Sequence, residues 1–205
     1  MTTKKEAIPI ARRIVTEVLE NTIPLSDIYK AIIEKREVIR YPNVLALEEL
    51  AEKIPEKIYP KFDYFFKLTK SENAFHRTIG INIIANLTKV DKKNKFEDIF
   101  DRYFSMIDDK SVMVTRNLVL SSNKIMENKP YLIQKITEKL LGIDTTHHDP
   151  IHSALIWGDI VEVLGNHYKK SKKKEKIIEF AKKQVNSASP STVKRAKAFL
   201  KKFLK

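Results

Sequence analysis

The sequence predicts an all-α fold, and three observations support that prediction. Glycine is scarce, with 4 residues among 205. Apolar residues recur at intervals of three and four along much of the chain, which is the period of a helix that buries one face. No segment shows the strict alternation of apolar and polar residues, bounded by turn residues, that a half-buried strand requires. We therefore expect helices packed on helices in a single domain.

The composition excludes several classes of function. The chain has no cysteine, so thiolate catalysis, cysteine-based zinc sites and a disulfide framework are ruled out. No run of about 18 apolar residues occurs, and a membrane span is not expected. The N-terminal residues mix charged with apolar residues, unlike a signal peptide. These features predict a cytoplasmic protein that needs no cofactor.

Four segments of the chain can be aligned as the starts of helices. Arg77, Arg116, Ala154 and Arg195 share one column of this alignment, at successive spacings of 39, 38 and 41 residues. Spacings near forty residues are typical of repeats built from two helices. The four segments read SENAFHRTIGINIIANL from residue 71, KSVMVTRNLVLSSNKIM from 110, HDPIHSALIWGDIVEVL from 148 and SPSTVKRAKAFLKKFL from 189.

Helix-capping residues accompany each aligned start. The third and fourth segments place an N-cap residue directly before a proline, at 149–150 and 189–190, and proline is well tolerated in a first helical turn. In the first two segments, Ser71 and either Asp109 or Ser111 can serve as the cap. Each aligned segment is therefore expected to begin a helix near its own first residues.

The apolar residues of these first helices predict buried stripes. The first stripe comprises Phe75, Ile79, Ile83 and Leu87, and the second comprises Val114, Leu118 and Ile125. The third helix carries instead a strip of small residues at Ala154, Gly158, Val161 and Gly165. Such a strip would let a neighbouring helix approach closely, although Gly165 could equally end the helix.

A second amphipathic helix follows each of the first three starts. We predict these helices at 96–107, from Pro130 onward, and at about 172–185. Their expected buried residues are Phe96, Ile99, Phe100, Tyr103, Phe104 and Ile107 in the first, Leu132, Ile133, Ile136, Leu140 and Leu141 in the second, and Ile177, Ile178, Ala181 and Val185 in the third.

The segment before residue 71 predicts four more helices. Residues 4–20 and 26–38 are expected to form two leading helices. Residues 44–53 and 60–68 predict an earlier and less regular pair, separated by a break at Pro55.

The aligned column, with a turn residue, a branched apolar residue and then arginine before a second amphipathic helix, resembles HEAT repeats and the related Armadillo-type superhelices. The resemblance covers residues 41–205 and departs from the column at Ala154. It implies a right-handed α-α superhelix, or α-solenoid, of about four repeats whose last repeat is a terminal cap. Residues 1–40 would be an N-terminal helical cap. Proteins of this kind serve as non-enzymatic binding scaffolds, and the resemblance implies no particular activity.

Positive charge is concentrated at the C-terminal end of the sequence. Between residues 169 and 205, fourteen lysines and arginines stand against Glu175 and Glu179, a net charge of +12 out of +13 for the whole chain. Such density can attract nucleic acid, acidic protein tails or anionic lipid, and the excess of lysine over arginine favours sequence-neutral contact with a nucleic-acid backbone over base reading. A solvated capping face is the alternative, a protein partner is also open, and the oligomeric state is not predicted. The predicted polyanion-binding residues are Lys169, Lys170, Lys172, Lys173, Lys174, Lys194, Arg195, Lys197, Lys201 and Lys202.

Two further groups of residues suggest chemistry but have simpler interpretations. His148, Asp149 and His152 could ligate a metal, yet Asp149 is better explained as a helix cap, so we expect no metal. Trp157 and Asp159 are similar to the aromatic and acidic residues of HEAT-like DNA glycosylases that act on alkylated bases, which gives the alternative function. Otherwise we expect Trp157 to pack between repeats and Asp159 to lie on the surface, with no catalytic residue.

Overall fold

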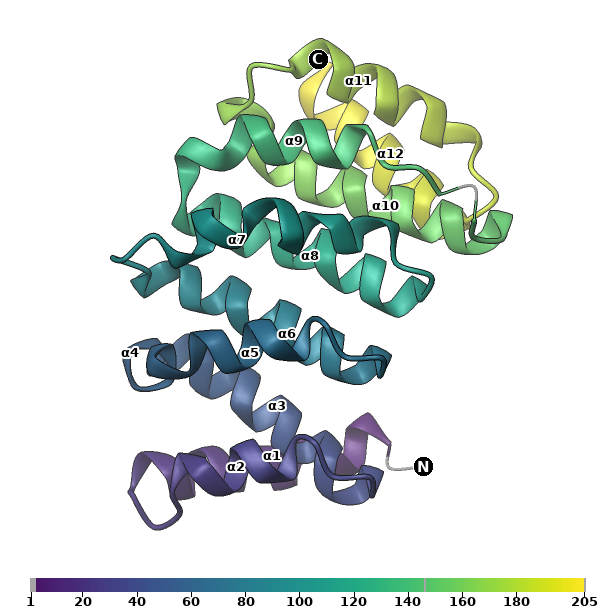
Figure 1. The fold of residues 1–205 in the computed structure, drawn as a ribbon. Helices are drawn as coiled ribbons and strands as arrows, with labels where there is room; N and C mark the ends of the chain where they lie inside the picture. Colours follow the sequence, from purple (N-terminus) through teal and green to yellow (C-terminus); the bar gives the residue numbers. More distant parts are fainter. Residues whose placement is uncertain (1–2, 146, 205) are drawn as a thin grey trace.

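A computed structural model describes residues 3–145 and 147–204 of the chain (Figure 1). Over these residues the secondary structure is entirely helical and contains no strand, which confirms the all-α prediction. None of the helices in the described ranges is both long enough and apolar enough to cross a membrane.

The helices follow one another with short connections, several of which contain a single turn of 3₁₀-helix. Their bounds are α1 Lys4–Leu19, α2 Leu25–Ala31, α3 Glu37–Lys53, α4 Pro55–Ile58, α5 Phe62–Leu68, α6 Ala74–Leu87, α7 Lys95–Phe104, α8 Val112–Asn128, α9 Ile133–Leu141, α10 Pro150–His167, α11 Lys174–Lys183 and α12 Pro190–Phe203.

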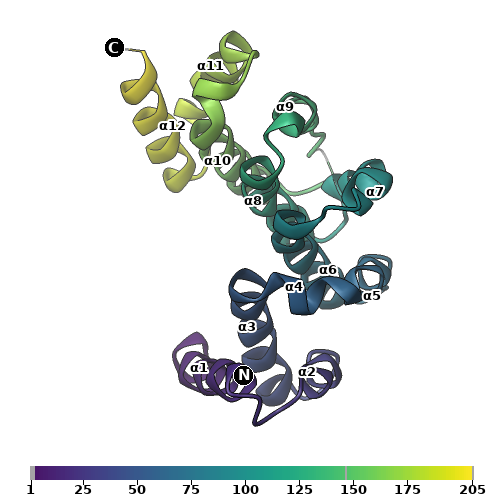
Figure 2. The ribbon, with the colours of Figure 1, turned by 90° about the vertical axis from the view of Figure 1, so that its left-hand side faces the viewer.

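The helices lie in two layers. Helices α1, α3, α6, α8, α10 and α12 pack side by side in chain order and form what we term the inner layer (Figure 1). Helices α2, α5, α7, α9 and α11 lie beside them as the outer layer. Figure 2 shows that the inner layer is curved, since its two end helices, α1 and α12, both lie to the same side of α6 in the middle of the layer. The apolar core fills the space between neighbouring helices along the whole stack.

The four aligned starts correspond to four helices of the inner layer. Helices α6, α8, α10 and α12 begin at residues 74, 112, 150 and 190, so their starts are spaced by 38, 38 and 40 residues. Asp149 and Ser189 are N-caps as predicted, because their side chains accept from the backbone N–H groups of His152 and Thr192. Helix α6 starts later than expected, since Asn73 rather than Ser71 accepts from the first turn.

The arginines of the aligned column do not occupy equivalent positions. Arg77 is buried and donates from Nε and Nη2 to the carboxylate of Asp109, at 2.8 Å for both bonds. Arg116 is instead half-exposed on the inner layer. Thr115, one residue earlier, is the position equivalent to Arg77. Its hydroxyl donates to the carbonyl of Asp109, and Arg77 likewise donates to the carbonyl of Ser71, which also lies six positions before it. The alignment is therefore wrong by one residue between the first and second repeats.

The N-terminal helices differ from the prediction. Helix α2 ends at Ala31, and α3 then runs without interruption from Glu37 to Lys53. The expected boundary between residues 40 and 41 therefore lies inside α3. Pro42 is buried within α3. Burial of the α3 face against α1 and α6 outweighs the loss of one backbone hydrogen bond there. The predicted break at Pro55 is confirmed.

Most residues of the predicted buried faces are buried, whereas Ile99, Leu141, Ile178 and Val185 are only partly buried and Phe75 is exposed. In α6, Ile79, Ile83 and Leu87 are buried, but Phe75 is 51% exposed. Phe75 lies in the first turn, where the Arg40 guanidinium stands over its ring at 4.9 Å from the centroid.

The small residues of α10 allow close packing with α12, as the sequence predicted. A Cβ atom at Gly158 would stand 2.3 Å from Oγ1 of Thr192, and one at Gly165 would stand 3.2 Å from Cδ2 of Phe199. Helix α10 continues to His167, so Gly165 does not end it. At Gly158 only a residue without a side chain fits at the observed separation of the two helices.

A buried ionic cluster joins three connections of the chain. Lys129 is only 4% exposed and forms ion pairs with Asp91 at 3.2 Å and Glu97 at 2.9 Å. Asp91 also accepts from the hydroxyl of Tyr59 and from the backbone N–H of Phe96. Burial tends to raise the pKa of Asp91, but these hydrogen bonds and Lys129 together hold it below the ordinary value.

Candidate functional site

An aromatic cluster brings the two lysine-rich segments together. The Tyr168 ring, at the end of α10, lies 5.3 Å from the Phe199 ring and 4.4 Å from the Phe203 ring of α12, measured between centroids. The turn that follows Tyr168 therefore lies beside the C-terminal half of α12. We term this region the cationic end, and it comprises Lys169, Lys170, Lys172, Lys173, Lys174, Lys194, Arg195, Lys197, Lys201 and Lys202.

Two of these residues are already held in ion pairs. Lys173 pairs with Glu138 of α9 at 2.8 Å, and Arg195 pairs with both Asp159 and Glu162 of α10. These contacts reduce the positive charge that either residue offers to a ligand.

Four exposed lysines of α12 remain available for a ligand. They lie away from the buried face of α12, and in the described part of the chain none of them forms an ion pair. Lys202 stands over the Phe203 ring at 5.1 Å. The four residues are Lys194, Lys197, Lys201 and Lys202.

Asp159 links three helices of the inner layer. Its side chain is 1% exposed, which contradicts the expectation that it lies on the surface. One carboxylate oxygen accepts from Nε of Arg116 in α8 at 2.6 Å, and the other accepts from Nη1 of Arg195 in α12 at 2.5 Å. The sequence did not reveal this arrangement because the three residues are 43 and 36 positions apart.

Trp157 does not face the same environment as Asp159. Trp157 is partly buried and packs against the core, while Asp159 points to the two arginines. The two residues are not brought together as a pair that could hold one ligand, because residues two apart on a helix point in different directions.

The histidine segment starts α10. The Asp149 carboxylate accepts from the backbone N–H of His152 and contacts Nδ1 of the same residue. The hydrogen bond to the His152 backbone, followed by the contact with its ring, holds the pKa of Asp149 below its ordinary value. Within residues 3–145 and 147–204, no group of three His, Cys, Asp or Glu side chains is arranged to hold a metal ion.

Polar side chains run across the inner layer between neighbouring helices. The Asn82 amide donates to Glu48 of α3 at 2.7 Å and to Asn117 of α8 at 3.2 Å. Farther along, Asn166 of α10 donates to Asn123 of α8 at 2.9 Å. These bonds cross the helix interfaces and hold the neighbouring helices in register.

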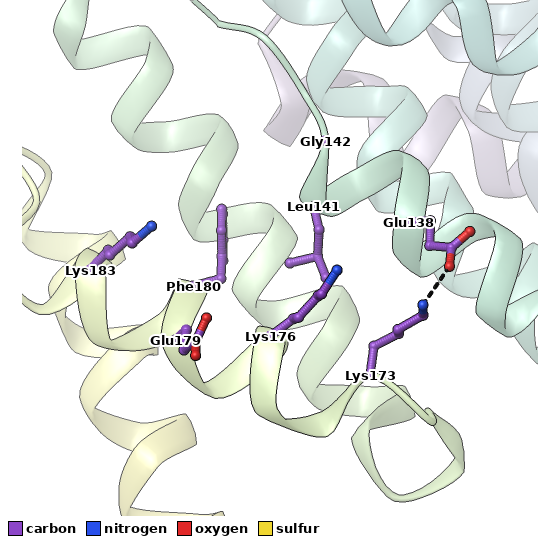
Figure 3. Close-up of a pocket in the computed structure, with 8 residues that line it drawn as sticks. All are labelled: Glu138, Leu141, Gly142, Lys173, Lys176, Glu179, Phe180 and Lys183. Carbon is purple, nitrogen blue, oxygen red and sulfur yellow. Dashed lines mark ion pairs between the residues drawn. The ribbon is translucent and has the colours of Figure 1, made fainter.

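A recess on the outer layer was not predicted from the sequence. It lies between α9 and α11 and has a volume of about 460 Å³ (Figure 3). Leu141 of α9 and Phe180 of α11 form its apolar floor, with Lys176 and Lys183 on either side of Phe180. The sequence contained one indication of this recess, because Lys176, Phe180 and Lys183 fall on one face of a helix and combine positive charge with an aromatic ring there.

Neither a known family pattern, nor a characterised protein, nor a solved structure matches this chain. The helical architecture, the charge distribution and the contacts described above are therefore the basis for inferring a function.

Proposed function

We propose that the chain is a HEAT-like α-solenoid that works as a non-enzymatic binding scaffold. Three features support the proposal: four inner-layer helices start 38 to 40 residues apart, outer-layer helices alternate with them along the chain, and the inner layer is curved (Figure 2). These are the features expected of helical pairs stacked into a right-handed superhelix.

We further propose that the cationic end binds a polyanion, with a nucleic-acid backbone as the first candidate. The observation that carries this proposal is the packing of Tyr168 on Phe199 and Phe203, which joins two basic segments that are separate in the sequence. Lysines at such an end neutralise phosphates as flexible point charges and release counterions. Binding should therefore be independent of nucleic-acid sequence and should weaken as salt rises.

The test replaces Lys194, Lys197 and Lys201 together by glutamine. All three are exposed and form no ion pair among the described residues, so folding should be retained. We expect earlier elution from heparin. For duplex DNA, the slope of log K against log salt should be smaller by about 0.9 for each phosphate that the variant no longer neutralises.

A matched control removes the same charge elsewhere. Lys89, Lys92 and Lys93 are exposed lysines in the connection between α6 and α7. Their triple replacement by glutamine should change retention far less. Equal retention of the two triple variants would refute the cationic end as a specific site, because net charge alone would then explain the binding.

The alternative, a DNA glycosylase acting on alkylated bases, has less support from the geometry. Its acidic residue would have to reach a substrate, whereas the Asp159 side chain is 1% exposed and both of its oxygens accept from arginines. Measurement of base release from alkylated duplex DNA tests this alternative. Release by the wild type that disappears in Asp159→Asn, while circular dichroism shows that the variant remains folded, would establish it over the scaffold.

A further inference from the structure

The recess between α9 and α11 combines an apolar floor with two lysines, Lys176 and Lys183, on either side of it (Figure 3). Leu141 and Phe180 are each only partly buried, so apolar surface remains open to a ligand. Lys176 and Lys183 are exposed, and neither forms an ion pair within the described residues. Because they are seven positions apart on one helix, their backbone positions are about 10 Å apart along its axis.

The rim of the recess disfavours a chain of phosphates. Glu138 and Glu179 both line it, and Lys173 is already paired with Glu138. A nucleic-acid backbone carries a charge at every nucleotide, so it would place phosphates against these carboxylates as well as against the lysines and would leave the apolar floor uncovered. A ligand that carries acidic groups at two separate points and an apolar group between them fits the arrangement better.

We propose that this recess binds an acidic amphipathic helix of a partner protein. Two carboxylates spaced by two turns of that helix contact Lys176 and Lys183, and an apolar side chain between them packs on Leu141 and Phe180. The spacing follows because a helix that lies along α11 has the same rise per residue, so its positions i and i+7 match those of the two lysines. This inference rests on the proposed scaffold function and gives it a partner of defined chemistry.

The probe is a fluorescein-labelled, alanine-based peptide of about 14 residues, with glutamates seven positions apart and two leucines between them. We expect saturable binding by fluorescence anisotropy. The double variant Lys176→Gln/Lys183→Gln should raise the Kd at least about tenfold, which corresponds to about 1.4 kcal/mol. A second peptide, with both leucines replaced by serine and the glutamates retained, should bind at least tenfold more weakly to the wild type.

The matched control is Lys92→Gln/Lys182→Gln. These exposed lysines belong neither to the lining of the recess nor to the cationic end, and the substitution removes the same charge. We expect a change in Kd of less than about twofold, with circular dichroism confirming that both double variants keep their helix content.

Three results would overturn the proposal. They are equal weakening by the two double variants, equal binding of the leucine and serine peptides, and no binding of the leucine peptide to the wild type. Loss of duplex-DNA retention in Lys176→Gln/Lys183→Gln would also overturn it, by assigning the recess to nucleic acid. Failure of the cationic end is distinguishable, because it concerns Lys194, Lys197 and Lys201 and leaves peptide binding unchanged.

Discussion

The close contact between α10 and α12 makes a specific prediction about Gly158. A methyl group at this position would stand 2.3 Å from Oγ1, 3.1 Å from Cβ and 3.2 Å from Cα of Thr192. The hydroxyl of Thr192 donates to the Ala154 carbonyl at 2.6 Å, and Thr192 is fully buried. Rotation of the Thr192 side chain would therefore break a buried hydrogen bond and would still leave its Cβ and backbone too close.

The size of the effect of Gly158→Ala follows from opposing contributions. Replacing a helix-interior glycine by alanine stabilises a helix by about 1 kcal/mol. Overpacking costs about 1–3 kcal/mol, and loss of the Thr192 hydrogen bond adds about 1 kcal/mol. We expect the free energy of unfolding to fall by about 2 kcal/mol. With a urea m value of about 2 kcal/mol/M, the unfolding midpoint would fall by about 1 M.

Gly165→Ala is the matched comparison on the same helix. The nearest neighbour of its added methyl group is the edge of the Phe199 ring at 3.2 Å, and a ring can shift by a few tenths of an ångström. The higher helix propensity of alanine should then outweigh the small cost of shifting the ring, so we expect the free energy of unfolding to be unchanged or to rise by up to about 1 kcal/mol. Urea unfolding followed by circular dichroism at 222 nm measures both variants.

A double-mutant cycle identifies the cause. In a Thr192→Ala background the closest contact is removed, so Gly158→Ala should cost at least about 1 kcal/mol less than in the wild type. The reasoning would be refuted if Gly158→Ala were as stable as Gly165→Ala, or if its cost were the same in both backgrounds.

Three further predictions concern buried polar groups. Asp159→Asn should lower the free energy of unfolding by about 2–3 kcal/mol, because it removes the negative charge that pairs with Arg116 and Arg195. Urea titration measures this change, and an unchanged unfolding midpoint would contradict the bridging role of Asp159. Lys129→Met should cost about 3 kcal/mol by the same assay, because the buried Asp91 carboxylate loses its cation; a cost below about 1 kcal/mol would count against the ionic cluster. Burial lowers the pKa of His167, so the folded state resists protonation and stability should fall as pH drops below about 6.5. Urea midpoints at pH 7.5 and 5.5 should differ less in His167→Gln, and an equal difference would contradict this assignment.

Helix content and repeat spacing could be predicted because they depend on local signals. Asp149 before Pro150 defined the start of α10, and the helix begins there. Predictions were wrong where distant contacts overrode a local signal. One predicted helix was to end at residue 38 and the next to begin at 44, but a single helix runs from Glu37 to Lys53 because its face is buried against neighbouring helices. Phe75 fits an apolar stripe, yet in the first turn of α6 its ring contacts the Arg40 guanidinium of α3 and stays 51% exposed.

The sequence predicted where the positive charges of the candidate site lie, but it did not predict which of them form ion pairs. The count of lysines after residue 169 located the cationic end. The sequence alone placed Asp159 on the surface and left Lys173 and Arg195 as unpaired cations, because their partners come from other helices. The recess between α9 and α11 likewise depends on Leu141 and Phe180 meeting across two helices.

By itself, the sequence determined the all-α class, the period near forty residues, the close-packing strip of α10 and the end of the molecule that carries the charge. Each of these depends on residues near one another in the chain, through helical periodicity, caps and composition. Only the tertiary structure decided which charges are neutralised, which apolar residues stay exposed and where a recess remains open. Those properties depend on side chains that lie dozens of residues apart and meet only when the helices stack.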